Sequence, residues 1–188
     1  MKKTISILIL LILIPMLCFA GALQEKQKAC ISKKNAAAPA SCDLYDELTG
    51  TEDNTVASES DGYIGQGLYN PATNITVCRL GFNFYTDPGG ATVTMAVYTT
   101  SGNNLGSVVV SATGAISGTG WKYLDVTPTA LANGTTYHIV TKVAGTTARI
   151  YDSATLALDE GELKRWDSDG VQSSTHSEYD AGVRIYSE

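Results

Sequence analysis

Trp166 stands in the longest polar stretch of the chain, residues 153–179, where acidic side chains follow the indole and tyrosines bracket the stretch. A flat aromatic ring beside hydrogen-bonding groups is what stacking on a sugar ring requires. A connection of this length is also longer than most structural loops. We therefore predict a ligand site that consists of Trp166, Tyr151, Tyr179, Asp167 and Asp169. The alternative is that Trp166 folds back and closes one end of the fold.

The sequence does not mark out a catalytic centre. Nucleophilic hydrolysis needs a base within reach of a serine or cysteine. The two histidines, His138 and His176, accompany no G-x-S-x-G sequence, and we interpret both as ordinary surface residues. Acids are numerous, but no pair is distinguished for glycoside hydrolysis. We therefore expect that the protein is not an enzyme, and a small secreted hydrolase is kept as an alternative.

Residues 167–170 alternate oxygen donors before a glycine, as part of a calcium loop does. The longer loop and terminal glutamate of the EF-hand pattern are missing. Acids of a solvated turn explain the segment as well. We expect no cofactor and no catalytic metal, with a structural calcium ion left open as an alternative.

Four cysteines occur, and Cys18 lies in the apolar N-terminal segment, so Cys30, Cys42 and Cys78 are the disulfide candidates. Export permits disulfides, and an odd count leaves one thiol over. Cys30 and Cys42 could close a small loop. Cys78 faces the same side of a predicted strand as Leu80, so we expect a buried free thiol there. Pairing of Cys42 with Cys78 is the alternative, and it would tie the N-terminal segment to the sheet.

Residues 1–22 have the pattern of a secretory signal peptide: a basic start, an apolar run over residues 4–17, and small residues at Ala20 and Ala22. The run is shorter than the ~18 residues that a spanning helix needs, and no second apolar run follows. An uncleaved anchor is the alternative. We expect a bacterial protein that is exported, either secreted or held at the cell surface, without a membrane span.

The net charge of the chain after residue 22 argues against two classes of binding partner. The segment after residue 22 keeps eleven basic and nineteen acidic residues, so the formal charge changes from −6 to −8. Nucleic acid and anionic lipid both require a basic surface, and the sequence has no basic stripe. We therefore expect neither as a partner, and the remaining length suits one domain.

Strands are the secondary structure that the sequence predicts around these candidate residues. Residues 74–101 contain two runs in which apolar and polar residues alternate around a Pro-Gly-Gly turn, which predicts a hairpin. Similar runs recur every 8 to 12 residues from position 61, and no helix is indicated. We predict an all-β, jelly-roll-like antiparallel β-sandwich of about eight or nine strands over residues 61–188, after an arm or linker over residues 23–60. Trp121 opens one of the strands, and we expect it to cap the core.

The order of motifs from residue 61 onward carries a resemblance. The motifs are Ile64-Gly-Gln-Gly-Leu-Tyr69, the strand over residues 75–84, Val93-Thr-Met-Ala-Val-Tyr98, Leu105-Gly-Ser107, Gly120-Trp121 and Leu131 with Tyr137. This order resembles jelly-roll modules of bacterial secreted and surface proteins and of phage tail proteins, some of which resemble carbohydrate-binding modules. The resemblance implies a non-catalytic binding module, with a glycan at a cell surface or in an extracellular matrix as the expected partner. A self-associating structural subunit of an extracellular assembly is the alternative.

Overall fold

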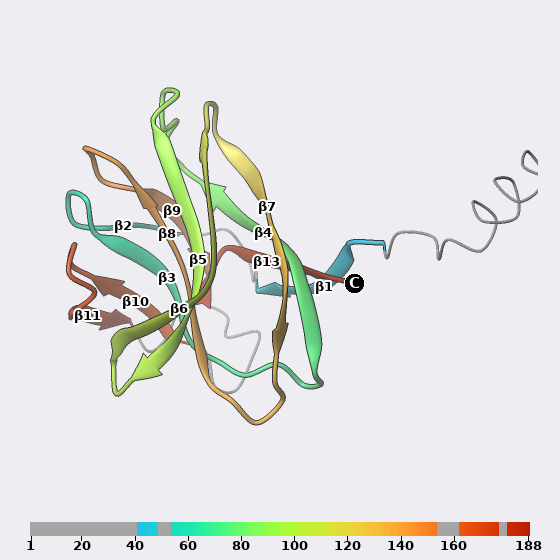
Figure 1. Ribbon diagram of the computed structural model, residues 1–188. Helices are drawn as coiled ribbons and strands as arrows, with labels where there is room; N and C mark the ends of the chain where they lie inside the picture. The colour runs from blue at the N-terminus through green and yellow to red at the C-terminus, as the bar shows by residue number, and fades with distance from the viewer. Residues whose placement is uncertain (1–40, 49–53, 154–161, 177–179) are drawn as a thin grey trace, which may run out of the picture. The chain divides into compact units, whose positions relative to one another are not determined.

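Two antiparallel sheets face each other in the part of the chain that the structure describes (Figure 1). The computed structural model describes residues 41–48, 54–153, 162–176 and 180–188, which form thirteen strands and no helix. The predicted fold class, an all-β antiparallel sandwich, is confirmed. The predicted signal peptide lies outside the described residues.

The first sheet has seven strands. They are β1 (Asp43–Leu48), β2 (Asn54–Ala57), β4 (Ile75–Phe84), β7 (Gly120–Leu131), β9 (Arg149–Ser153), β12 (Asp180–Ala181) and β13 (Val183–Ser187). The order is β1-β13-β4-β9-β12, with β7 paired to β4 and β2 paired to β9. β4 is therefore the central strand, and it pairs with β7, β9 and the C-terminal strand β13.

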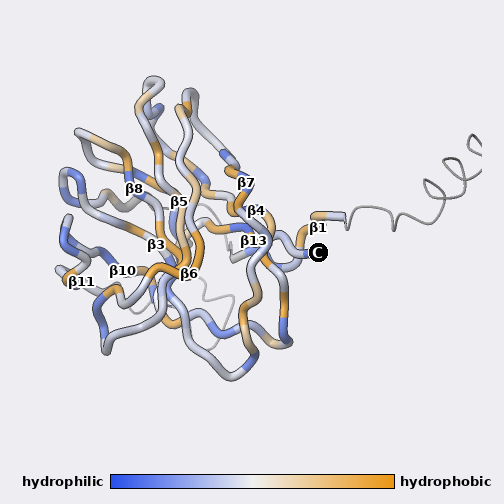
Figure 2. The backbone as a smooth tube through the Cα atoms, viewed as in Figure 1, coloured by the Kyte–Doolittle hydropathy of each residue, from blue (hydrophilic) through white to orange (hydrophobic). Residues whose placement is uncertain are grey.

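The second sheet has six strands. They are β3 (Tyr63–Tyr69), β5 (Thr92–Ser101), β6 (Asn104–Ala115), β8 (Tyr137–Val143), β10 (Glu162–Trp166) and β11 (Gln172–His176). The order is β11-β10-β3-β8-β5-β6. Figure 2 shows apolar residues along the strands and hydrophilic residues gathered at the connecting turns, which is the pattern of a core between two sheets.

Period-two alternation explains the core. Leu80, Phe82 and Phe84 of β4 are fully buried, and they belong to the same core cluster as Val93, Met95 and Val97 of β5. Side chains at alternate positions of a strand share one face, so each sheet turns one apolar face inward. The residues at the intervening positions of the seven-stranded sheet lie on its outer face.

The predicted hairpin over residues 74–101 is wrong. β4 belongs to the seven-stranded sheet and β5 to the six-stranded sheet, so residues 85–91 arch from one sheet to the other. β5 instead makes its hairpin with β6, where Ser101 pairs with Asn104. Two alternating runs bury the same residues whether they pair side by side or face each other across a core, and alternation alone does not distinguish these arrangements.

Segments that look irregular in the sequence also contribute strands. β1 pairs with β13, and β2 pairs with β9, although both lie in the segment predicted as an arm. β10 and β11 come from the long polar segment, and β12 follows directly after it. These strands raise the count above the predicted eight or nine, because polar edge strands show little apolar alternation. The compact unit accordingly begins at Ser41 instead of residue 61.

A disulfide joins Cys42, just before β1, to Cys78 in β4. The expectation of a free thiol at Cys78 is wrong, and the alternative pairing is correct. Cys30 lies outside the described residues. The bond closes a separation of 36 residues, and a loop of that size stabilises a fold by about 4 kcal/mol through chain entropy. Among the described residues, no helix is long and apolar enough to cross a membrane.

Candidate functional site

Trp166 is fully buried, so the prediction that its ring is exposed for stacking on a sugar is wrong. The indole packs with Ala96 and Val140 on the outer side of the six-stranded sheet, and its Nε1 donates a hydrogen bond of 2.9 Å to the carbonyl of Asn103. The turn between β5 and β6 thus covers the ring. The alternative, that Trp166 folds back onto the protein, is what the structure shows.

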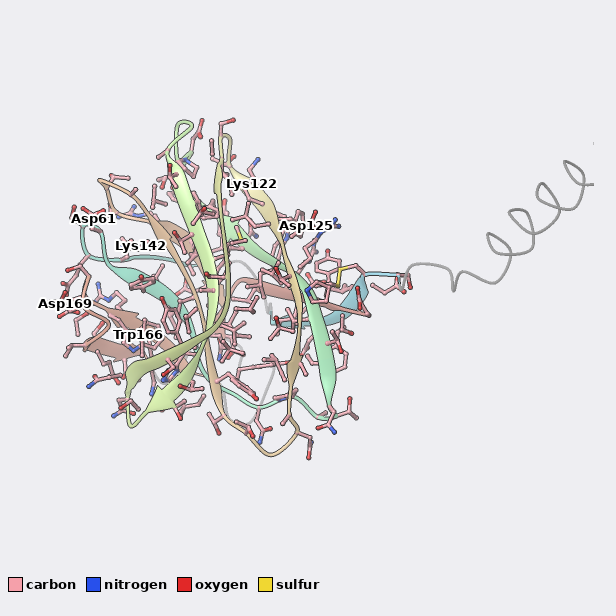
Figure 3. All side chains as sticks on the ribbon, viewed as in Figure 1. Asp61, Lys122, Asp125, Lys142, Trp166 and Asp169 are labelled. Atoms are coloured by element: carbon pink, nitrogen blue, oxygen red, sulfur yellow. A yellow bond between two sulfur atoms is a disulfide. The ribbon has the colours of Figure 1, made fainter. Side chains whose placement is uncertain are left out.

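The other described residues of the predicted site do not form a common site with Trp166. Tyr151 lies on β9 of the opposite sheet, where its ring meets that of Tyr85 edge to face at 5.3 Å. The Asp167 carboxylate accepts hydrogen bonds of 2.9 Å from the N–H groups of Asp169 and Val171, which closes the β10–β11 turn. Asp169 is exposed in that turn (Figure 3). Tyr179 lies outside the described residues.

His138 is fully buried beside Trp166, and the expectation that it is a surface residue is wrong. The two ring centroids are 5.0 Å apart, and Nδ1 accepts a hydrogen bond of 3.4 Å from the N–H of Leu68. Burial, with the nearby Lys164 ammonium, lowers the pKa of His138 to about 4. The imidazole is therefore neutral and enclosed at neutral pH. Among the described residues, no group of three or more His, Cys, Asp or Glu could hold a metal ion.

A different set of side chains lies together on the outer face of the seven-stranded sheet. β7, β4 and β13 are neighbours there, with Tyr123 opposite Gly81 and Gly81 opposite Arg184. The next row aligns Asp125, Arg79 and Tyr186 in the same way. We call the set formed by Trp121, Tyr123, Arg184, Tyr186 and Arg79 the aromatic platform. Figure 3 places Asp125, next to the platform, on the side of the molecule opposite Trp166 and Asp169.

The rings of the platform contact one another in sequence. Trp121 and Tyr123 are nearly parallel, with centroids 6.4 Å apart and an angle of 15°. Tyr123 meets Tyr186 edge to face at 5.7 Å. A Cβ atom at Gly81 would lie 2.7 Å from ring atoms of Tyr123, so glycine is needed for the ring to extend across β4. The Tyr123 residue stays 37% exposed, which leaves aromatic surface open to a ligand.

Arg184 holds the middle of the platform. Its Nη1 donates to the Tyr123 hydroxyl at 2.7 Å, and its Nη2 pairs with Glu47 Oε1 at 2.7 Å. The guanidinium also lies 4.0 Å from the centroid of the Trp121 ring. The hydrogen bond to Glu47 is the largest cause that raises the pKa of Arg184, so the group stays charged. A guanidinium on an indole face is a favourable cation–π arrangement.

Arg79 forms the other polar edge of the platform. Its Nε lies 2.5 Å from Asp125 Oδ1, and its guanidinium lies 5.7 Å from the centroid of the Tyr186 ring. Each platform arginine thus has a carboxylate partner, and the surface combines rings with balanced charges. Such a surface can pack on an apolar ring face and can exchange hydrogen bonds with hydroxyl groups at its edges.

Sequence reasoning missed the platform and misplaced Trp121, which is half-buried on the outer face and does not cap the core. A signal was present, because Trp121, Tyr123 and Asp125 alternate with period two, as do Arg184 and Tyr186. However, these pairs are about sixty residues apart, and only the pairing of β7 and β13 on either side of β4 brings them together.

The fold and the platform define an antiparallel β-sandwich with an aromatic outer face. No family model matches the chain, and no curated protein matches it. Among solved structures, the chain is similar to the clostridial cysteine protease Cwp84 after propeptide cleavage, with a TM-score of 0.53 and 12% identity. The match covers 81% of this chain and 41% of that chain. The chain therefore spans less than half the length of the protease, and a likeness at this identity concerns the fold alone.

Proposed function

We propose that the chain is an exported, non-catalytic binding module that holds a glycan on the aromatic platform. The observation that carries the proposal is the exposed Tyr123 ring, which Gly81 and Arg184 hold across the outer face of the sheet. A sugar ring would pack its C–H face on Tyr123 and Trp121. Its hydroxyl groups would donate to Asp125 or Glu47 and accept from the arginines.

Charge balance favours a neutral glycan for this surface. Arg79 is paired with Asp125 and Arg184 with Glu47, so neither guanidinium is left for an anionic sugar. Aromatic stacking contributes about 1 kcal/mol per ring beyond area burial. Binding to one platform is therefore weak, and several linked copies would be needed for strong attachment to a surface.

Three further observations support this proposal over a catalytic one. The N-terminal pattern predicts export, the order of sequence motifs resembles that of jelly-roll binding modules, and His138 is buried away from solvent. We propose a cell surface or an extracellular matrix of a bacterial system as the place of action, and no catalytic activity.

A glycan array tests the proposal directly. Wild type is compared with Tyr123→Ala and Trp121→Ala, and with Tyr85→Ala as a control that removes an exposed tyrosine away from the platform. We expect wild type and the control to bind the same neutral glycans and both platform variants to lose them. Circular dichroism confirms that each variant is folded.

Two outcomes of the array would contradict the proposal. If wild type binds no glycan, the function is wrong, and light scattering then examines the structural-subunit alternative. If wild type binds but both folded platform variants bind equally well, the platform is not the site. Release of sugar from any bound glycan would favour the hydrolase alternative.

A further inference from the structure

The β4–β5 and β8–β9 connections lie at the same end of the sandwich (Figure 1). Residues of these two connections line a cleft of about 270 Å³. Its apolar part is formed by the buried residues Phe84, Val143 and Ala148. Its polar part includes Thr146, Thr147 and Arg149, all of which are exposed. An apolar base with a few polar groups around it is the usual composition of a small-molecule site.

Arg149 differs from the arginines of the platform. Among the described residues, no carboxylate forms an ion pair with it, whereas Arg79 and Arg184 each have one. Its guanidinium lies 5.9 Å from the centroid of the exposed Tyr85 ring. An arginine that pairs with none of the described carboxylates, placed beside a cleft in an acidic protein, can offer its bidentate donors to an anion.

The carboxylate of Asp87 also lines the cleft, but its hydrogen bonds are made within the protein. Oδ1 accepts the N–H of Gly89 at 2.7 Å and the N–H of Gly118 at 2.5 Å. These bonds lower the pKa of Asp87 and connect the β4–β5 arch to the β6–β7 turn. Asp87 therefore fixes one wall of the cleft and is occupied in that structural role.

The opposite wall is tethered in a similar way. Asp61 Oδ1 accepts the N–H of Gly145 at 2.6 Å, and the N–H of Asp61 donates to the carbonyl of Thr146 at 3.1 Å. Both walls of the cleft are thus held by carboxylate-to-backbone hydrogen bonds. A site whose walls are fixed in advance loses less conformational entropy when a ligand binds.

We propose that this cleft binds a single carboxylate-bearing ring, of which a hexuronic acid is the representative. The ligand carboxylate pairs with the Arg149 guanidinium, the ring rests on the apolar base, and its hydroxyl groups reach Thr146 and Thr147. The cleft lies below the ~300 Å³ at which drug-sized ligands begin to fit, so it accommodates one ring and not a chain. The proposal is independent of glycan binding on the platform, because the two sites share no residue.

The test is an NMR titration of the whole protein with three probes: glucuronate, its neutral counterpart glucose, and methyl β-glucuronide, which represents the end of a glycan chain. We expect glucuronate to shift the amide signals of residues 143–149 and glucose to leave them unchanged. Binding of methyl β-glucuronide as well would assign the site to chain ends, and its failure to bind would assign the site to the free acid.

Variants then attribute the binding to Arg149. Arg149→Gln is expected to weaken glucuronate binding roughly tenfold, as loss of a charged hydrogen bond does, and Arg149→Lys should retain part of it. Arg165→Gln is the control, because Arg165 lies on β10, bonds to Ser174, and belongs neither to the cleft lining nor to the platform, and it should bind like wild type. The proposal is overturned if glucuronate does not bind, if glucose binds equally well, or if folded Arg149→Gln keeps wild-type affinity.

Discussion

The guanidinium of Arg184 lies 4.0 Å from the centroid of the Trp121 ring, a contact that joins β13 to β7 over the central strand β4. The same guanidinium pairs with Glu47 on β1. One side chain thus connects residues on three strands of the seven-stranded sheet. These strands are neighbours only in the folded state, so the contacts of Arg184 stabilise the fold. The same side chains form part of the candidate site.

Replacement of Arg184 by glutamine should lower the free energy of unfolding by about 1 kcal/mol, because the ion pair and the cation–π contact are partly exposed to solvent. Chemical denaturation measures the change. Arg184→Lys serves as the comparison, since it keeps the charge but loses the planar fork that contacts Tyr123, Glu47 and Trp121. Wild-type stability in Arg184→Gln would show that the network contributes nothing.

Gly81→Ala should displace the Tyr123 ring, because the new Cβ would lie 2.7 Å from it. We expect a loss of about 1–3 kcal/mol in unfolding free energy, as in other overpacked sites. In a Tyr123→Ala background the same glycine substitution should cost much less, because the obstructing ring is gone. A double-mutant cycle by urea denaturation measures this coupling, and purely additive effects would contradict the close approach.

Removal of the disulfide by a Cys42→Ala and Cys78→Ala double variant should lower unfolding stability by about 2–4 kcal/mol, since the unfolded chain regains the freedom of the loop. Wild type measured with a reducing agent should match the variant, whose own stability should not respond to that agent. A thiol assay of unreduced wild type in denaturant checks the pairing. Free thiols at both Cys42 and Cys78 would contradict the bond between β1 and β4.

Stability should fall with acidification through His138. Its folded pKa of about 4 lies below the ordinary value of about 6.5, so protonation favours the unfolded chain. This contribution is complete above the unfolded pKa and is lost as the pH falls toward the folded pKa. It amounts to about 2 kcal/mol between roughly pH 7.5 and pH 5. His138→Phe should flatten the pH profile of denaturation in that window, and an unchanged slope would contradict a buried neutral imidazole.

Trp166→Phe should retain wild-type ligand binding, because the indole is buried and forms no part of the platform. Loss of the Nε1 hydrogen bond to the carbonyl of Asn103 should lower stability by about 1–3 kcal/mol. Thermal denaturation and the glycan array, carried out side by side, separate these two effects. Loss of glycan binding without loss of stability would indicate that the glycan site lies around Trp166, as the sequence predicts.

The fold class follows from the amino-acid sequence alone. Leu80, Phe82 and Phe84 alternate with polar or small residues, and this period predicts a strand with one buried face whatever its partners are. The same local information did not determine which sheet each strand joins, so the hairpin between β4 and β5 was predicted where an arch occurs. Alternation specifies a face and leaves the neighbour open.

The residues of the candidate site could be identified only from the tertiary structure. Trp166 and Trp121 both stand beside polar residues in the sequence, and both lie on the outer side of a sheet, yet the first is fully buried and the second is only half-buried. The side of a strand that a ring occupies, and what then covers it, depend on register with strands distant in the sequence. Cys78, buried as the sequence predicted, likewise formed its disulfide because β1 joins β13 next to β4. Local pattern decides which residues leave water, and long-range pairing decides which residues meet.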